Sequence, residues 1–359
     1  LGPGRLEVNG REISARAIVL ATGSSPVVPP AWQVLGDKLL TTDTLFEPES
    51  LPPRIAVVGL GAIGVEMAQA LARLGIEVAA FGRGHLGGLT DAKVSAAATA
   101  LLGGEFALHL GAEAEVIAAD GAIRVRAGDA EATVDAVLAA LGRRPNLAGL
   151  GLEALGIALD ARGLPPVDPN TQQVANLPLF LAGDANGQVP LLHEAADEGH
   201  IAGLNAVRVA TGEKPVCFAR RTPLAIVFSE PNIAVAGRRR ADLADGTFIE
   251  GEIDFARQGR ARAGQRNHGL MRIYAGKDTG KLLGAEMCAP AAEHMAHLLA
   301  LALDRGMTVR ELLRLPFYHP VLEEGLRSAL RELAAQLPPA GDSDLNACDF
   351  EALGAEALD

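Results

Sequence analysis

The sequence has only three cysteines in 359 residues, no basic run longer than three residues and no long apolar stretch. Cys217, Cys288 and Cys348 are widely separated, which argues against a disulfide framework and fits a reducing compartment such as the cytoplasm. Cys217 and Cys288 stand in apolar or mixed surroundings, so we predict that both are buried thiols. No stretch is long enough for a transmembrane helix, and no signal peptide is visible. The net charge of −12 argues against nucleic acid or an anionic membrane as a partner.

A glycine-rich turn is the strongest local motif. The predicted order is a strand at 54–58, the turn Gly59-Leu60-Gly61-Ala62-Ile63-Gly64, a helix at 65–74 and a strand at 76–81. Gly59 permits the tight turn, Gly61 lets a pyrophosphate approach the backbone, and Gly64 lets the helix pack closely on the sheet. The free amides at the helix start, at Ala62 and Ile63, favour phosphate. The motif predicts dinucleotide binding; the alternative is a turn without a ligand.

The end of the second strand bears on the choice between NAD and NADP. NAD sites usually have an acidic residue there for the ribose hydroxyls, whereas this chain has Gly82 followed by Arg83. A guanidinium can pair with a 2′-phosphate, so these residues favour NADP weakly. The alternative is that Arg83 is a solvated surface charge.

A second nucleotide signature is divided between two distant segments. Residues 17–24 form an apolar strand that ends in the small-residue turn with Thr22 and Gly23. Far downstream, a strand at 179–182 leads to Gly183 and Asp184, at the edge where open α/β sheets bind ligands. A helix is predicted at 193–206, and its start at Leu191, Leu192 and His193 offers amides to an anionic ring. The alternative for Asp184 is a turn or N-cap aspartate.

Taken together, these motifs resemble those of the flavoprotein disulfide reductases, the family of dihydrolipoamide dehydrogenase, glutathione reductase and mercuric reductase. The matching residues follow one order over about residues 15–332: Ala21-Thr22-Gly23, Gly59 to Gly64 with Glu66, Leu141-Gly142-Arg143-Arg144-Pro145-Asn146, Ala182-Gly183-Asp184, Thr222-Pro223, Phe228 to Gly237, and His319-Pro320 with Glu324. The resemblance implies FAD and NAD or NADP as cofactors, with Glu66, Gly142 and Arg143 also at the cofactor sites.

The resemblance also assigns the chemistry to His319 and Glu324. In relatives, a His before a Pro accepts a proton from a dithiol, and a carboxylate five residues later orients its ring. An imidazole titrates near neutrality and needs a partner for its second nitrogen, so this spacing fits the role. The motif departs from the commoner version, because Val321 replaces a Thr. The resemblance further implies a cis bond between His319 and Pro320.

The implied fold class is α/β, with a partial FAD domain and an NAD(P) domain, both Rossmann-like, and a C-terminal α+β dimerisation domain. The boundaries that we predict are 1–35 and 145–216 for the FAD part, 36–144 for the NAD(P) domain, 220–338 for the dimerisation domain and 339–359 for an acidic tail. In the last domain we expect strands near 225–228, 233–236, 269–274 and 281–289, and helices at 291–304, 309–313 and 321–335. We expect a homodimer in which Val321, Leu322, Leu326 and Leu330 face a second copy.

Two features of the family are missing from these residues. The Cys-x4-Cys redox pair is absent, and no first FAD glycine turn precedes residue 54. We therefore expect both to lie upstream of Leu1 in a longer enzyme, and the chain by itself to be colourless and inactive as a disulfide reductase. The alternative is a truncated form that has lost catalysis.

The expected function is FAD-dependent NAD(P)H:disulfide oxidoreduction, closest to dihydrolipoamide dehydrogenase. The partner would be a small disulfide or dithiol substrate or a lipoyl domain, and no metal site is expected. Two alternatives stay open: a pyridine-nucleotide transhydrogenase or other NAD(P)H-flavin oxidoreductase, which needs neither His319 nor a cysteine pair, and an inactive binding fragment. Mercuric reductase is disfavoured, because no paired cysteines occur at the C-terminus.

Overall fold

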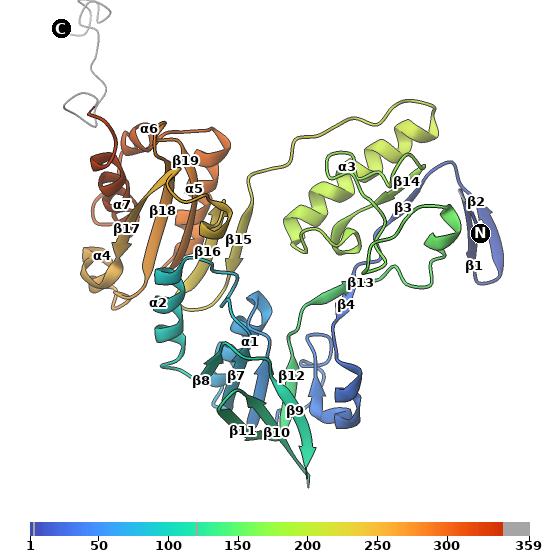
Figure 1. Cartoon of the computed structure of the whole chain (residues 1–359), viewed down its shortest axis with the longest axis horizontal. Helices are drawn as coiled ribbons and strands as arrows, with labels where there is room; N and C mark the ends of the chain where they lie inside the picture. Colours follow the sequence, from blue (N-terminus) through green and yellow to red (C-terminus); the bar gives the residue numbers. More distant parts are fainter. Residues whose placement is uncertain (3, 120, 340–359) are drawn as a thin grey trace, which may run out of the picture. The chain divides into compact units, whose positions relative to one another are not determined.

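The structure is a computed structural model that describes residues 1, 2, 4–119 and 121–339 (Figure 1). Apart from Pro339, the predicted acidic tail with Cys348 lies outside the described residues. The chain divides into two compact units. The first combines Leu1–Pro30 with Leu141–Arg221, and the second combines Ala31–Ala140 with Thr222–Asp359.

Short sheets and one long helix make up the first unit. Its strands are β1 (Arg5–Val8) with β2 (Arg11–Ser14), β3 (Ile18–Leu20) with β14 (Leu179–Leu181), and β4 (Ser24–Pro26) with β13 (Arg143–Pro145). Its helices are α3 (Leu192–Ala210) and the short 3-10 turns η2 (Leu152–Leu155) and η3 (Gly183–Asn186). The β3–β14 pair is parallel, with Ile18 opposite Leu179. This pairing brings the two halves of the divided nucleotide signature together.

The first half of the second unit is a parallel sheet with strand order β5-β12-β6-β7-β8. Its elements are η1 (Pro30–Lys38), β5 (Leu39–Leu40), β6 (Arg54–Val58), α1 (Ala62–Arg73), β7 (Glu77–Gly82), α2 (Ala92–Leu102), β8 (Ala107–Leu110) and β12 (Ala136–Ala139), with an antiparallel β9 (Glu115–Ala119), β10 (Ala122–Ala127) and β11 (Ala130–Val134). Strands β6 and β12 consist mostly of apolar residues and are buried on both faces, as is usual for strands inside a parallel sheet. The predicted strand–turn–helix–strand order is confirmed.

A five-stranded antiparallel sheet with order β15-β16-β19-β18-β17 forms the second half. Its elements are β15 (Leu224–Val227), β16 (Asn232–Gly237), η4 (Arg240–Asp242), β17 (Phe248–Asp254), η5 (Phe255–Arg257), α4 (Gly259–Ala263), β18 (Leu270–Gly276), β19 (Leu282–Ala289), α5 (Ala292–Asp304), α6 (Val309–Leu313) and α7 (Glu324–Ala335). The predicted strands and helices of this half are confirmed, but α7 begins three residues later than expected. The elements of the second unit that were not predicted include α2, β17 and α4.

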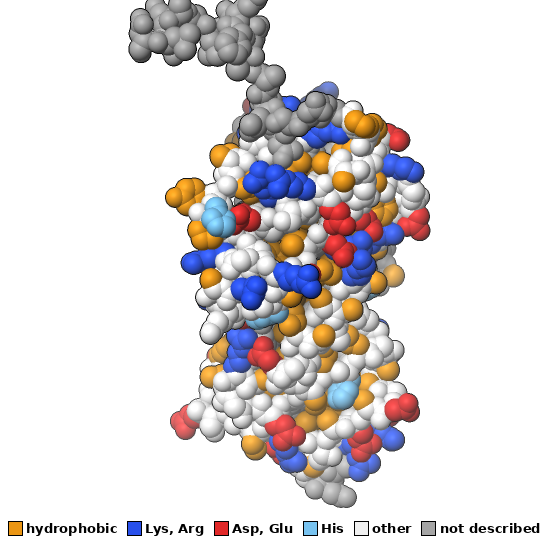
Figure 2. All heavy atoms as spheres, turned by 90° about the vertical axis from the view of Figure 1, so that its left-hand side faces the viewer, with side chains coloured by type: hydrophobic (Ala, Val, Ile, Leu, Met, Phe, Trp, Pro, Cys, Tyr) orange, Lys and Arg blue, Asp and Glu red, His pale blue; other side chains and the backbone are white. Residues whose placement is uncertain are grey.

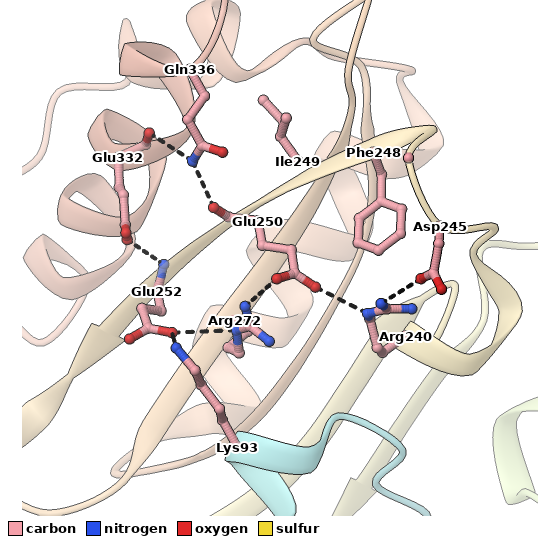
Figure 3. A pocket seen from close by; sticks show the side chains of 11 residues that line it. Lys93, Arg240, Asp245, Phe248, Ile249, Glu250, Glu252, Arg272, Glu332 and Gln336 are labelled. Atoms are coloured by element: carbon pink, nitrogen blue, oxygen red, sulfur yellow. Dashed lines mark hydrogen bonds and ion pairs between the residues drawn. The ribbon is translucent and has the colours of Figure 1, made fainter.

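Buried charges join the two halves of the second unit. Arg272 of β18 pairs with Asp91, the N-cap of α2, at 2.7 Å, and also with Glu250 of β17. The fully buried Glu286 accepts hydrogen bonds from the backbone N–H and the hydroxyl of Thr90. Of these residues, Arg272 and Glu250 line a polar cavity of about 490 Å³ between Lys93 and β17 (Figure 3). No residue of the predicted cofactor or catalytic motifs lines this cavity.

Candidate functional site

The glycine turn between β6 and α1 has the geometry of a phosphate cradle. Gly59 has a φ of 101°, which favours glycine. A side chain at Gly64 would place its Cβ 1.8 Å from the carbonyl oxygen of Gly59, so this position must be glycine. A Cβ at Gly61 would meet no atom within 4 Å. The space beside Gly61 is therefore open to a ligand, and no side chain caps the first amides of α1, which begin at Ala62 and Ile63.

Glu66 connects the two halves of the second unit. It lies one turn into α1, and its Oε1 accepts a hydrogen bond of 2.8 Å from the backbone N–H of Phe228. This contact fixes the α1 turn against the C-terminal half. The carboxylate of Glu66 therefore contacts the loop that follows β15, and this contact is not with the open space beside Gly61.

The end of β7 has no carboxylate near the glycine turn. Gly82 is buried, and a Cβ there would lie 3.1 Å from the side chains of Leu60 and Leu110. The close packing leaves little room for an acidic side chain at this position. The next residue, Arg83, is exposed to solvent at the carboxyl edge of the sheet.

In the first unit, Ser24, Arg143 and Asp184 form one hydrogen-bonded group. The hydroxyl of Ser24 donates to Oδ2 of Asp184 at 2.5 Å and accepts from Nε of Arg143 at 2.8 Å. The Arg143 guanidinium also lies 3.9 Å from the Asp184 carboxylate and bonds to the Ser24 carbonyl. The sequence motifs predict Arg143 and Asp184 as cofactor-binding residues but not Ser24, the residue that joins them.

A side chain that was not predicted as a site residue also holds the turn at Thr22 and Gly23. The amide of Asn146 donates to the Thr22 carbonyl at 3.0 Å, and its backbone N–H donates to the Gly23 carbonyl at 2.9 Å. Gly142, which was expected at a cofactor site, accepts the backbone N–H of Val27 in the same unit. Asn146 directly follows β13, the strand that carries Arg143. This position is the sequence signal that could have identified Asn146 as a site residue.

The start of α3 is supported by a buried ionic cluster. Leu191 is the N-cap, and the side chains of Leu192 and His193 are exposed. About two turns further, the fully buried carboxylate of Glu198 accepts a hydrogen bond of 2.9 Å from the backbone N–H of Gly183. Arg220 pairs with Glu198 at 3.0 Å and also with Glu194. Burial raises the pKa of Glu198, and the hydrogen bonds and Arg220 oppose this effect. The cluster fixes the strand end that presents Asp184.

His319 and Glu324 form the predicted pair. Nδ1 of His319 lies 2.9 Å from Oε1 of Glu324, and the second oxygen of Glu324 accepts the backbone N–H of Val321 at 3.2 Å. The His319–Pro320 peptide bond is cis, as the resemblance implied. The hydrogen bond from His319 holds the pKa of Glu324 below its usual range. The imidazole is 81% exposed, so its Nε2 edge is open to a reactant.

Two expectations about buried and exposed residues are wrong. Leu326 and Leu330 do not face outward, because both are fully buried in the chain's own core, where α7 covers β17. Gly251 of β17 permits this close packing, since a Cβ there would lie 2.3 Å from a carbonyl oxygen of α7. Cys217 is exposed rather than buried. Cys288 is buried as predicted, and burial raises the pKa of its thiol to about 12.

Neither a metal centre nor a membrane-spanning helix is present in the described part of the chain. No three His, Cys, Asp or Glu side chains there are placed to bind a metal ion. None of the described helices combines the length and the apolar character that crossing a bilayer requires.

Sequence comparison places both units in one family. Residues 3–199 match the pyridine nucleotide-disulphide oxidoreductase family, and residues 224–330 match the dimerisation domain of the same family. Mitochondrial dihydrolipoyl dehydrogenase from Canis lupus familiaris is 31% identical over 331 residues, which are 88% of this chain and 64% of that protein. Mercuric reductase from Acidithiobacillus ferrooxidans is 32% identical over 336 residues, 92% of this chain and 59% of that protein.

Solved structures agree with this assignment. LpdA from Mycobacterium tuberculosis has a TM-score of 0.77 at 28% identity, covering 92% of this chain and 74% of that one. The flavoprotein disulfide reductase RclA from Escherichia coli has a TM-score of 0.78 at 24% identity, over 93% of this chain and 77% of that one, and this likeness supports the fold alone. The chain spans less than two thirds of the length of the curated relatives. It belongs to the pyridine nucleotide-disulphide oxidoreductase family.

Proposed function

We propose that this chain supplies the nicotinamide-binding and proton-accepting parts of an FAD-dependent NAD(P)H:disulfide oxidoreductase of the dihydrolipoamide dehydrogenase type. The observation that carries the proposal is the His319–Glu324 pair at 2.9 Å, in a chain whose family uses pyridine nucleotides on disulfides. The expected substrate is a small dithiol or a lipoyl group on a carrier domain. The reducing compartment inferred from the separate cysteines is the cytoplasm.

Each cofactor has residues that fit it. The open space at Gly61 and the uncapped amides of α1 fit the pyrophosphate of NAD or NADP. The exposed Arg83 and the absence of a carboxylate at Gly82 favour NADP. Asp184, held by Ser24 and next to the α3 start, fits the hydroxyl-bearing side of FAD. When bound, the flavin passes reducing equivalents between dithiol and nicotinamide.

The chain's own residues would handle the proton. With Nδ1 of His319 held by Glu324, the Nε2 edge can accept a proton from a substrate thiol, and the carboxylate stabilises the imidazolium that results. The exposed ring suits approach by a second copy of the chain, and residues 224–330 match a dimerisation domain, so we propose a homodimer. Sedimentation velocity measures this directly: a monomer at micromolar concentration contradicts it.

The test of the function uses the flavin-bound holoenzyme that contains these residues, because the chain by itself is expected to be colourless and inactive. Reduction of NAD(P)⁺ by dihydrolipoamide and reduction of a dye by NAD(P)H are measured in wild type and in His319→Gln. We expect the variant to lose dithiol turnover by roughly 10²- to 10⁴-fold, the usual range for a general base, and to keep dye reduction. The matched carboxylate pair extends the test, because Glu324→Gln should slow dithiol turnover and Glu323→Gln should not. Equal loss of both activities in His319→Gln would contradict the proposed role.

A second candidate is favoured by one observation, the absence of a Cys-x4-Cys pair from these residues. In that case the protein binds pyridine nucleotides without dithiol chemistry, as a transhydrogenase-type or binding protein. A wild-type holoenzyme that reduces the dye and shows no dithiol turnover would support this candidate.

A further inference from the structure

A short arginine-rich segment stands out in this acidic protein. Arg257, Arg260, Arg262 and Arg266 fall within ten residues, interleaved with small and polar residues, and no acidic residue occurs between Phe255 and His268. All four are exposed. None of their guanidinium groups makes an ion pair or hydrogen bond with a residue in the described part of the chain, unlike Arg240 and Arg272, whose carboxylate partners lie close by. Figure 2 shows several Lys and Arg side chains on the face of the molecule where α4 lies in Figure 1.

Buried contacts attach this segment to the loop that carries His319. Gln258, which lies among the four arginines, is 8% exposed, and its side-chain amide donates to the carbonyl of Val321 at 2.7 Å. The side-chain oxygen of Gln258, Oε1, caps α4 by accepting a hydrogen bond of 2.6 Å from the backbone N–H of Ala261. Next to it, the ring of Phe255 packs against the position of Gly325, 3.0 Å from where a Cβ would lie. The orientation of α4 is therefore fixed relative to the His319–Glu324 pair.

We propose that the segment Arg257–Arg266 is the docking surface for an acidic protein that carries the dithiol substrate to His319. The proposal rests on the proposed function for the identity of the cargo, but the docking itself does not depend on catalysis. Unpaired guanidinium groups bind carboxylates well, since their forked donors match the two oxygens. Charges at the rim of an interface mainly steer and orient the partner.

The charge distribution favours a protein with a local acidic patch over nucleic acid. The chain as a whole has a net charge of −12, so a long polyanion that extended beyond the segment would meet repulsion. At physiological ionic strength, screening limits these interactions to about 8 Å. A compact acidic patch can contact the arginines alone.

The experiment measures binding of a fluorescein-labelled ten-residue glutamate peptide by fluorescence anisotropy. We expect salt-sensitive binding to the wild type and an increase in Kd of about tenfold in Arg257→Glu/Arg260→Glu, as for several lost charge pairs. The matched control is Lys277→Glu/Arg305→Glu, which changes the net charge by the same amount. Lys277 and Arg305 are exposed at the opposite end of the sheet, because Lys277 follows β18 whereas α4 precedes it. Circular dichroism verifies that both variants fold.

The outcomes separate the possibilities. A selective loss in Arg257→Glu/Arg260→Glu supports the docking surface. Equal losses in the two variants, no binding to the wild type, or tighter binding of a ten-nucleotide DNA than of the peptide would overturn it. If the protein binds the peptide but the holoenzyme shows no dithiol turnover, the docking surface is supported and the proposed function is contradicted. If the holoenzyme shows dithiol turnover but the peptide does not bind, the proposed function is supported and the docking surface is contradicted.

Discussion

Nδ1 of His319 lies 2.9 Å from Oε1 of Glu324, five residues further along the chain, and the His319–Pro320 peptide bond between them is cis. The hydrogen bond from His319 is the main cause that lowers the pKa of Glu324. We therefore predict that His319→Gln raises the pKa of Glu324 toward its ordinary value, measured by carboxyl NMR titration. Glu311 is the control, because Thr308 lowers its pKa without help from His319.

The same shift sets a pH dependence with a defined sign. The folded-state pKa of Glu324 lies below its unfolded value, so its stabilising contribution is complete above the unfolded pKa of about 4.5 and is lost as the pH falls through the folded pKa. In His319→Gln the loss of stability below about pH 4.5 should be smaller than in the wild type. An unchanged acid-unfolding profile, together with an unshifted Glu324, would show that the pair is not formed in solution.

Two glycines of the nucleotide turn provide a matched pair of substitutions. Gly64→Ala puts a Cβ 1.8 Å from the Gly59 carbonyl oxygen and should destabilise the protein by about 1–3 kcal/mol or more, as overpacking does. Gly61→Ala places its Cβ in open space and should leave the melting temperature nearly unchanged. Both should weaken NADPH binding, Gly61→Ala by occupying the phosphate position. Calorimetry and fluorescence titration measure the two effects; tight NADPH binding by Gly61→Ala would exclude this turn as the site.

Arg83 is predicted to give the chain a preference for NADPH over NADH. In Arg83→Ala we expect the Kd for NADH divided by the Kd for NADPH to fall about fivefold, which is the size expected for the loss of one partly exposed charge-assisted contact. NADH affinity should hardly change, since NADH lacks the 2′-phosphate. A clear preference of the wild type for NADH, unaffected by Arg83→Ala, would remove this role.

The buried ion pair of Arg272 and Asp91 joins the two halves of the second unit. Asp91 has only 1% of its side chain exposed, so Arg272→Met would leave a buried carboxylate without its ionic partner. We expect a loss of roughly 3–5 kcal/mol in the free energy of unfolding, measured in urea. Arg162→Met is the control. Its partner Asp160 is exposed, and removal of that pair should cost less than about 1 kcal/mol.

Several unpredicted elements had signals that could have identified them. Asp is a preferred N-cap residue, so Asp91 directly before 92–102 would have predicted the start of α2. In the structure its side chain accepts hydrogen bonds from the backbone N–H groups of Lys93 and Val94. The alternation of Ile249, Gly251 and Ile253 with acidic residues is typical of a strand with one solvated face, and would have predicted β17. Other features had no local signal. Leu326 and Leu330 have the spacing of an apolar stripe, but the stripe alone does not say whether the chain's own sheet or a second copy covers it.

The sequence by itself determined the glycine turn between β6 and α1 and the His319–Glu324 spacing, because both depend on residues close together in the chain. Only the tertiary structure decided which distant residues meet. Ser24 contacts Asp184 across 160 residues and Arg143 across 119, and Glu66 binds Phe228 in the other half of its unit. The burial of Glu198 and the packing of α7 on β17 were decided in the same way. These contacts depend on strand pairing and helix packing, which bring together residues that are far apart in sequence. The local sequence around each residue does not indicate which distant residue it will contact.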